Sequence, residues 1–147
     1  MTKRIGINGF GRIGRLVIRG LQHHPELQPV IINDPASTPE TSAHLLQFDT
    51  VHGRYDGRVT VERDYLTIDG QTVAHTAHDT PGAVPWAEHG VDIVLECSGR
   101  FRTAEKLQPY LDGGVPKVIV AAPVKSDGVL NVVVGCNDQL YLSLIHI

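Results

Sequence analysis

The sequence of 147 residues contains little cysteine, few aromatic residues and no long hydrophobic run. Its two cysteines, Cys97 and Cys136, are too few for a disulfide framework, so we expect a cytoplasmic protein. The longest apolar runs, such as Val118–Ala122, are far shorter than the ~20 residues that cross a bilayer. We therefore expect no contact with a membrane.

Acidic residues are missing from the first 25 positions, which hold five basic ones: Lys3, Arg4, Arg12, Arg15 and Arg19. The whole chain nevertheless has a formal net charge of −3, which argues against a general nucleic-acid binder. The basic start is the one feature that favours such binding. A composition of 41% hydrophobic and 20% charged residues is typical of a folded globular domain. The length predicts one domain.

Short apolar runs alternate with stretches of helical period along most of the chain. The expected strands cover residues 3–8, 30–32, 92–97, 117–122 and 131–135, and the expected helices cover residues 13–21, 40–47 and 103–112. Between them, three runs within residues 58–75 are rich in Val, Thr and Ile, with Asp69-Gly70 as a turn pair, and predict antiparallel hairpins. This order predicts an α/β fold: a doubly wound, mostly parallel sheet with a small antiparallel hairpin insertion.

A G-x-G-x-x-G motif, Gly9 to Gly14, lies directly between the first expected strand and the first expected helix. An acidic residue, Asp34, follows 20 positions after Gly14, at the end of the next expected strand. This spacing is the dinucleotide-binding fingerprint of a Rossmann βαβ unit. The alternative is a tight turn whose glycines serve packing alone, followed by a surface aspartate.

Each part of the fingerprint has a physical role. Gly9 permits the tight turn, Gly11 lets the backbone approach a pyrophosphate, and Gly14 allows the helix to pack closely on the strand. The free N–H groups and the positive end of the helix attract phosphate. Asp34 can accept hydrogen bonds from the adenosine ribose and would repel a 2′-phosphate, so we expect NAD rather than NADP.

Several segments carry a closer resemblance. Residues 7–15 (INGFGRIGR) and 44–54 (HLLQFDTVHGR) closely resemble stretches of phosphorylating glyceraldehyde-3-phosphate dehydrogenases. Residues 96–101 (ECSGRF), 118–125 (VIVAAPVK) and 134–138 (VGCND) follow at the spacing of that family. The resemblance covers residues 3–141 and implies that residues 1–141 form a Rossmann domain with NAD as cofactor.

The resemblance also implies a set of cofactor-binding residues. Arg12 and Ile13 would offer backbone N–H groups to the pyrophosphate, and Asp34 would hold the adenosine ribose. His78 stands where the family usually has an arginine near the adenine, Ser98 replaces the usual threonine, and Ala121 replaces a serine near the nicotinamide. The full set is Asn8, Gly9, Phe10, Gly11, Arg12, Ile13, Gly14, Asn33, Asp34, His78, Ser98, Gly99 and Ala121. We expect no metal site.

The chemistry of the resembling family requires residues that this sequence does not contain. A cysteine thiolate in a Cys-Thr-Thr-Asn-Cys stretch attacks the aldehyde, assisted by a histidine, and phosphate cleaves the thioester. Neither motif is present, so we expect no catalytic residue here, and we expect Cys97 and Cys136 to be buried small side chains. The resemblance implies that a full-length protein acts on a small phosphorylated aldehyde and inorganic phosphate, as a homotetramer.

Three alternatives stay open from the sequence. Two lie within the family: erythrose-4-phosphate dehydrogenase, and the arsenate-resistance branch in which arsenate replaces phosphate. The third is a non-catalytic NAD-binding module. Residues 142–147 (LSLIHI) depart from the polar continuation of the family, and we expect them to be a non-native tail. Without the parts that cover such a domain in the family, we expect the chain to self-associate.

Overall fold

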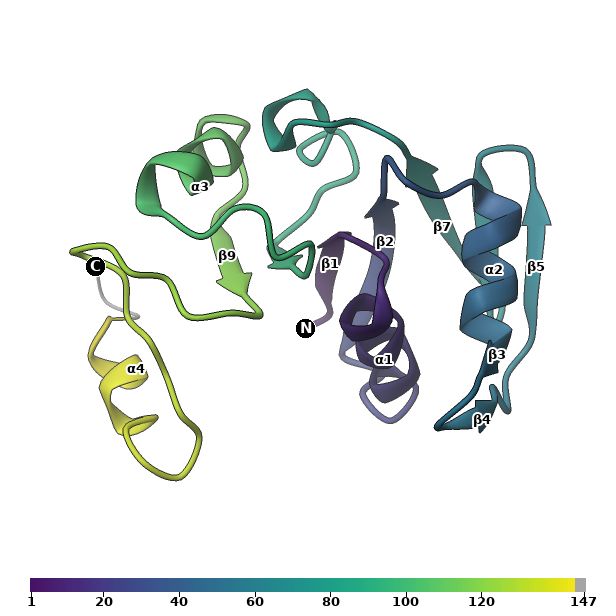
Figure 1. Ribbon diagram of the computed structural model, residues 1–147, viewed down its shortest axis with the longest axis horizontal. Coiled ribbons are helices and arrows are strands. Elements are labelled where there is room, and N and C mark those ends of the chain that lie inside the picture. Colours follow the sequence, from purple (N-terminus) through teal and green to yellow (C-terminus); the bar gives the residue numbers. More distant parts are fainter. Residues whose placement is uncertain (145–147) are drawn as a thin grey trace.

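The computed structural model describes residues 1–144, and its centre is a sheet of seven strands in the order β5-β6-β7-β2-β1-β8-β9 (Figure 1). Strand β1 (Lys3–Asn8) lies in the middle, between β2 (Leu27–Asn33) and β8 (Ile93–Glu96). Beyond them, β7 (Gln71–Thr76) pairs with β2 and β9 (Lys117–Val120) pairs with β8. All four of these pairings are parallel, which confirms the predicted mostly parallel sheet.

The predicted hairpins are present, but they extend the main sheet rather than standing apart from it. Strands β5 (Val59–Glu62) and β6 (Tyr65–Ile68) pair antiparallel, and β6 pairs antiparallel with β7. Asp69 and Gly70 both have positive φ, 50° and 83°, as the hairpin turn between β6 and β7 requires. A separate two-stranded antiparallel sheet joins β3 (Phe48–Asp49) to β4 (Gly53–Arg54).

Helices cover both faces of the sheet because side chains alternate along its strands. Ile5 and Ile7 of β1 are buried in one core with Ile18 of α1 (Arg12–Leu21) and Leu46 of α2 (Pro39–Gln47). Between those two isoleucines, Gly6 faces the other way, and a Cβ there would lie 2.8 Å from the Trp86 ring.

The second core lies on that opposite face. It contains Trp86, Val94 and Tyr110, the last from α3 (Ala104–Asp112). A short 3-10 helix, η1 (Pro81–Ala83), contacts α3 on this side. Helix α3 forms as predicted although it contains Pro109, and Thr103 caps it by accepting a hydrogen bond from the backbone N–H of Lys106 at 3.3 Å. The two cores make the fold doubly wound.

The strand predicted at residues 131–135 is wrong. Val132, Val133 and Val134 are exposed, with 41%, 59% and 87% of their surface accessible. The backbone N–H groups that a strand ladder would use are taken locally. Val133 N–H donates to Asn137 Oδ1 at 2.6 Å, and Gly135 N–H donates to Asp138 Oδ1 at 2.9 Å. Short polar side chains therefore divert this segment into turns that lead to α4 (Gln139–Leu144).

The expected non-native tail overlaps the end of the described chain. Residues 142–144 belong to α4, and residues 145–147 lie outside the described residues, so the nature of the tail stays a prediction. Among residues 1–144, no helix has the length and the apolar character that a bilayer span requires.

Candidate functional site

The carboxyl ends of β1, β2, β7 and β8 surround a hollow of about 250 Å³, which we call the carboxyl-edge pocket. From the central strand β1 the chain passes to β2 and β7 on one side, and it later returns to β8 and β9 on the other. Such a switch in winding direction is where α/β sheets bind ligands. The residues that line the pocket are Asn8, Gly9, Gly11, Asp34, Pro35, Ala36, His78, Asp79, Cys97, Ser98, Arg100 and Phe101.

The three glycines of the fingerprint differ in what surrounds them. Gly9 has φ +89°, and a Cβ there would lie 2.6 Å from the backbone N and Cα of Ser98, so only glycine fits between the ends of β1 and β8. A Cβ at Gly14 would collide with the carbonyl oxygen of Gly9. At Gly11, by contrast, a Cβ would meet no atom of the described residues within 4 Å. Gly11 therefore leaves room for a ligand to approach the backbone.

Helix α1 begins at this pocket without a side chain to satisfy its first turn. Gly11 is the N-cap and has no side chain, and the first turn contains no acidic residue. The N–H groups and the positive end of the helix dipole therefore stay available for an anion. Arg12 and Ile13 are exposed in this turn. The geometry fits a pyrophosphate group held by backbone N–H groups.

Asp34 follows β2 and is fixed at the wall of the pocket by two backbone hydrogen bonds. Its Oδ2 accepts from the N–H of Phe10 at 2.9 Å, and its Oδ1 accepts from the N–H of Ala36 at 2.9 Å. Each oxygen retains a further lone pair for a ligand hydroxyl. The phenyl ring of Phe10 is buried in the core, so this residue contributes through its backbone.

Asn33 is 1% exposed and supports the pocket from below rather than lining it. Its Nδ2 donates to Asn8 Oδ1 at 2.8 Å and to the carbonyl oxygen of His78 at 2.9 Å. Its Oδ1 accepts from the N–H of His78 at 2.8 Å and from the hydroxyl of Thr76 at 2.9 Å. These bonds fix His78, which lines the pocket.

Ser98 and Cys97 complete the opposite wall. The N–H of Ser98 donates to Glu96 Oε1 at 2.8 Å, and its hydroxyl donates to the same oxygen. Burial raises the pKa of the Cys97 thiol to about 11, and the nearby charge of Glu96 contributes. Cys97 is therefore a neutral thiol at physiological pH, not a nucleophile. Cys97 is half-buried rather than fully buried as expected. The expectation of burial is wrong for Cys136, which is exposed because it lies in the turns before α4.

The structure places some expected residues outside the pocket and adds others. Four of the expected residues are exposed and do not line it: Arg12, Ile13, Gly99 and Ala121. Three others are buried and do not line it: Phe10, Gly14 and Asn33. The lining residues that were not in the expected cofactor-binding set are Pro35, Ala36, Asp79, Cys97, Arg100 and Phe101. All six lie within two positions of an expected residue, and three of them directly follow one, because a ligand at the strand ends contacts the first few residues of each loop. That adjacency is the signal that could have found them.

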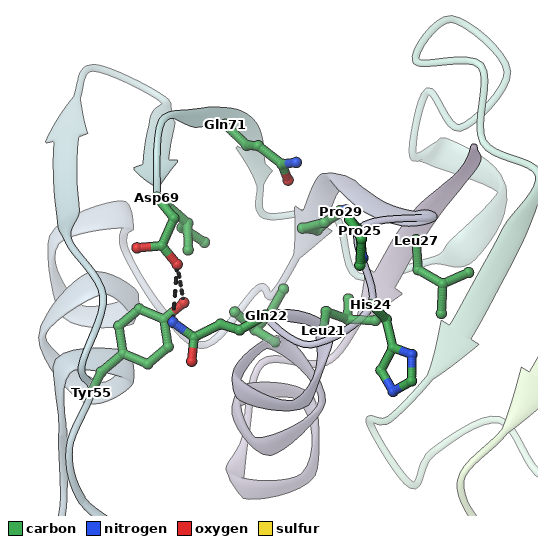
Figure 2. Close-up of a pocket in the computed structure, with 11 residues that line it drawn as sticks. Leu21, Gln22, His24, Pro25, Leu27, Pro29, Tyr55, Asp69 and Gln71 are labelled. Atoms are coloured by element: carbon green, nitrogen blue, oxygen red, sulfur yellow. Dashed lines mark hydrogen bonds between the residues drawn. The ribbon is translucent and has the colours of Figure 1, made fainter. Parts of the chain in front are cut away.

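A larger hollow of about 350 Å³, the amino-edge pocket, lies at the other edge of the sheet, where β2 and β7 begin (Figure 2). In it Tyr55 donates its hydroxyl proton to Asp69 Oδ2 at 2.5 Å, and Gln22 donates to the same oxygen at 3.1 Å. This hollow does not suit a dinucleotide despite its size. It borders the carboxyl end of α1, whose dipole repels phosphate.

Other titratable side chains form no metal centre in the described part of the chain, where no three His, Cys, Asp or Glu residues are placed to bind one ion. His75 is buried within β7, and its Nε2 lies 2.9 Å from the hydroxyl oxygen of Ser42 in α2. Burial lowers the pKa of His75, although Asp34, Asp64 and Glu40 act against the shift. This pair joins α2 to the sheet.

Comparison with known proteins points to one family. Residues 3–104 match the model of the glyceraldehyde 3-phosphate dehydrogenase NAD binding domain. Glyceraldehyde-3-phosphate dehydrogenase 3 of Nostoc sp. is 51% identical over 141 residues, which are 96% of this chain and 42% of that protein. Glyceraldehyde-3-phosphate dehydrogenase of Debaryomyces hansenii is 46% identical, with the same coverage of 96% and 42%.

A third relative, glyceraldehyde-3-phosphate dehydrogenase of Coccidioides posadasii, is 42% identical over 100% of this chain and 43% of its own length. The chain thus spans about two fifths of the length of these relatives. Its fold, its Gly-rich turn and this match agree on NAD as the cofactor. The chain belongs to the glyceraldehyde 3-phosphate dehydrogenase family, whose NAD binding domain it contains.

Proposed function

We propose that the carboxyl-edge pocket binds NAD with its adenosine ribose on Asp34 and its pyrophosphate at the first turn of α1. One observation carries this proposal: the Gly-rich turn, the uncapped start of α1 and the Asp34 carboxylate converge on a single hollow. The bond from Phe10 N–H to Asp34 fixes the acid relative to the turn. Ribose hydroxyls and phosphate can therefore be held at the same time.

The remaining pocket residues take roles on either side of the pyrophosphate. His78 lies on the side of Asp34 and would contact the adenine, whereas Asn8 and Ser98 lie where β1 and β8 end, toward the nicotinamide. Arg12 and Ile13 would donate through their backbone N–H groups. Gly99 and Ala121 lie beyond the pocket lining and would contact the nicotinamide end only if the ligand extends past it.

We further propose that the chain supplies the cofactor site of a longer protein that oxidises a small phosphorylated aldehyde and transfers the resulting acyl group to inorganic phosphate. The names of the relatives support the aldehyde, and NAD would supply the hydride acceptor. The nucleophilic cysteine and the histidine base would come from residues that this sequence does not contain. Assembly as a homotetramer and a cytoplasmic location stay predictions.

The experiment is a calorimetric titration of the 147-residue chain and its Asp34→Ala variant with NAD and with NADP. Loss of hydrogen bonds to a charged group should weaken NAD binding by about ten- to a hundredfold. NADP binding should change less, because the same substitution removes the repulsion of the 2′-phosphate. The preference for NAD over NADP should therefore shrink.

Glu88→Ala is the matched control, because it removes an exposed acidic side chain that does not line the pocket. It should bind NAD as tightly as the unsubstituted chain does. An Asp34→Ala variant that binds NAD with unchanged affinity would contradict the proposed position of the ribose.

A further inference from the structure

A buried carboxylate lies beneath the carboxyl-edge pocket, and four hydrogen-bond donors converge on it. Glu96, at the end of β8, is 1% exposed. Its Oε2 accepts from Asn8 Nδ2 at 2.7 Å and from the hydroxyl of Tyr110. Its Oε1 accepts from the N–H and from the hydroxyl of Ser98. Two of these partners, Asn8 and Ser98, line the pocket.

A chain of hydrogen bonds connects this carboxylate to the ends of the neighbouring strands, through Asn8 and Asn33 to His78. Because Glu96 accepts from the Nδ2 of Asn8, the Oδ1 of Asn8 faces Asn33, which donates to it at 2.8 Å. The Oδ1 of Asn33 is then left to accept from the N–H of His78 at 2.8 Å. Each step pairs a donor with an acceptor, so the acceptor at Glu96 sets the orientation of both buried amides.

We propose that Glu96 is a positioning residue for the cofactor, which orients Asn8 and Ser98 in the pocket wall and, through Asn33, the backbone of His78. This inference rests on the proposed NAD site, because it concerns the same pocket. Glu96 itself is buried beneath the pocket and does not line it. Its effect on binding is therefore indirect, through the groups that it holds.

The chemistry at position 96 explains why a carboxylate, and not an amide of the same size, is needed there. The Nδ2 of Asn8 and the N–H of Ser98 can only donate, and they approach different oxygens of Glu96. A glutamine would direct its own NH2 group at one of them and leave two donors facing each other. Either the side-chain amide of Asn8 rotates by half a turn or Ser98 is displaced. Both residues line the pocket, so either change alters the pocket wall.

Tyr110 contributes to the same carboxylate from α3, on the face of the sheet opposite α1. Its side chain is completely buried and packs beside Trp86, with ring centroids 5.9 Å apart. A phenylalanine would keep this packing and remove one donor from Glu96. The substitution therefore tests the network without filling or emptying the core.

The test measures the dissociation constant of NAD for Glu96→Gln and Tyr110→Phe, well below the unfolding temperature of every variant. Glu96→Gln should weaken binding about tenfold or more, and Tyr110→Phe about two- to tenfold. Tyr55→Phe is the matched control for Tyr110→Phe, because Tyr55 also donates its hydroxyl proton to a carboxylate, at the amino-edge pocket. It should lower the unfolding temperature and leave NAD binding unchanged.

Four outcomes are distinguishable. Weaker NAD binding in Tyr110→Phe but not in Tyr55→Phe supports the inference even if Glu96→Gln does not fold. Unchanged binding in Tyr110→Phe, or an equal loss in the two tyrosine variants, overturns it. If Asp34→Ala weakens NAD binding while the Glu96 and Tyr110 variants do not, the NAD site stands and the inference alone fails. If neither the unsubstituted chain nor any variant binds NAD, the site fails and the inference fails with it.

Discussion

The two edges of the sheet contain the same chemical pair in different surroundings. At each edge a tyrosine donates its hydroxyl proton to a carboxylate: Tyr110 to Glu96 at the carboxyl edge, and Tyr55 to Asp69 at the amino edge. Glu96 is buried and its four donors include pocket-lining groups, whereas Asp69 is exposed. At the amino edge the pair fastens a hairpin turn to the segment after β4, and Gln22 at the end of α1 donates to the same carboxylate. At the carboxyl edge the pair lies beneath the candidate pocket.

Size alone would favour the other hollow as the cofactor site. The amino-edge pocket is the larger, at about 350 Å³ against about 250 Å³. The direction of α1 decides between them, because the helix turns its positive end to the smaller pocket and its negative end to the larger one. The comparison teaches that the polarity of the surrounding backbone, rather than volume, identifies the anion site.

The largest expected difference between the edges is in the loss of stability when one glycine at each edge, Gly9 or Gly70, is replaced by alanine. Gly9 and Gly70 have similar φ, +89° and +83°, but a Cβ at Gly9 would lie 2.6 Å from the Ser98 backbone. At Gly70 it would meet no atom of the described residues within 4 Å. We expect Gly9→Ala to cost about 3 kcal/mol or more and to abolish NAD binding, and Gly70→Ala to cost about 1 kcal/mol.

Chemical denaturation gives the free energy of unfolding for both glycine variants, and calorimetry gives their affinity for NAD. The Gly70→Ala variant serves as the control for the cost of positive φ alone. Equal losses of stability in the two variants would show that the close approach of β1 to β8 matters little.

Acid should lower the stability of the protein in two separate pH ranges, first through His75 in β7 and then through Asp69 at the amino edge. Burial lowers the pKa of His75 in the folded protein below its ordinary value of 6.5. The unfolded chain therefore binds this proton first, and stability falls as pH drops below about 6.5. His75→Gln can keep a hydrogen bond to Ser42. In this variant the unfolding temperature should change less between pH 7 and pH 5 than in the unsubstituted chain. A profile as steep as that of the unsubstituted chain would show that another group causes the loss.

The smallest effect is expected from Asp69→Asn at the amino edge. Burial acts against it, but hydrogen bonds from Tyr55, the Arg58 backbone and Gln22 together lower the pKa of Asp69 below its ordinary 3.8. The stability that this carboxylate contributes is present above about pH 4 and disappears as pH falls through its folded pKa.

Asp69→Asn should therefore cost about 1 kcal/mol at pH 7 and less at pH 3, measured by chemical denaturation. Its affinity for NAD should equal that of the unsubstituted chain. A weaker affinity would mean that the two edges are coupled through α1, which lines the amino-edge pocket and whose N-cap Gly11 lines the carboxyl-edge pocket.

Much of the fold was predictable because most of the apolar runs in the sequence form strands of the sheet. The runs at residues 3–8 and 117–122 are apolar enough to predict buried strands, and they form β1 and β9. The prediction of burial is wrong for β9, in which no residue is fully buried and Ile119 is 46% exposed. The run at residues 131–135 is equally apolar, but Asn137 and Asp138 capture its N–H groups, and no count of apolar residues reveals that competition. In the same way, the hairpins were expected from their turn residues, but the pairing of β7 with β2 depends on distant contacts.

The candidate site was predictable where it is local in sequence. The Gly-rich turn and Asp34 follow from spacing, since both lie within one βαβ unit. Glu96 was quoted only as part of a resembling segment, and its role depends on Asn8, 88 positions away, and on Tyr110 from another helix. Residues that act through buried partners carry no signal in a single sequence.

The position of β1 in the middle of the sheet sets the time at which binding becomes possible during synthesis. Gly9 is made early, but its neighbour Ser98 and the strand that carries it are made almost 90 residues later. Until β8 pairs with β1, the wall of the pocket that contains Ser98 is missing. The first βαβ unit, β1-α1-β2, supplies only the wall that contains Asp34. Such a non-local pairing closes a long loop and forms slowly. We therefore expect a nascent chain released before Ser98 to fail to retain NAD, so that cofactor capture marks completion of the sheet centre.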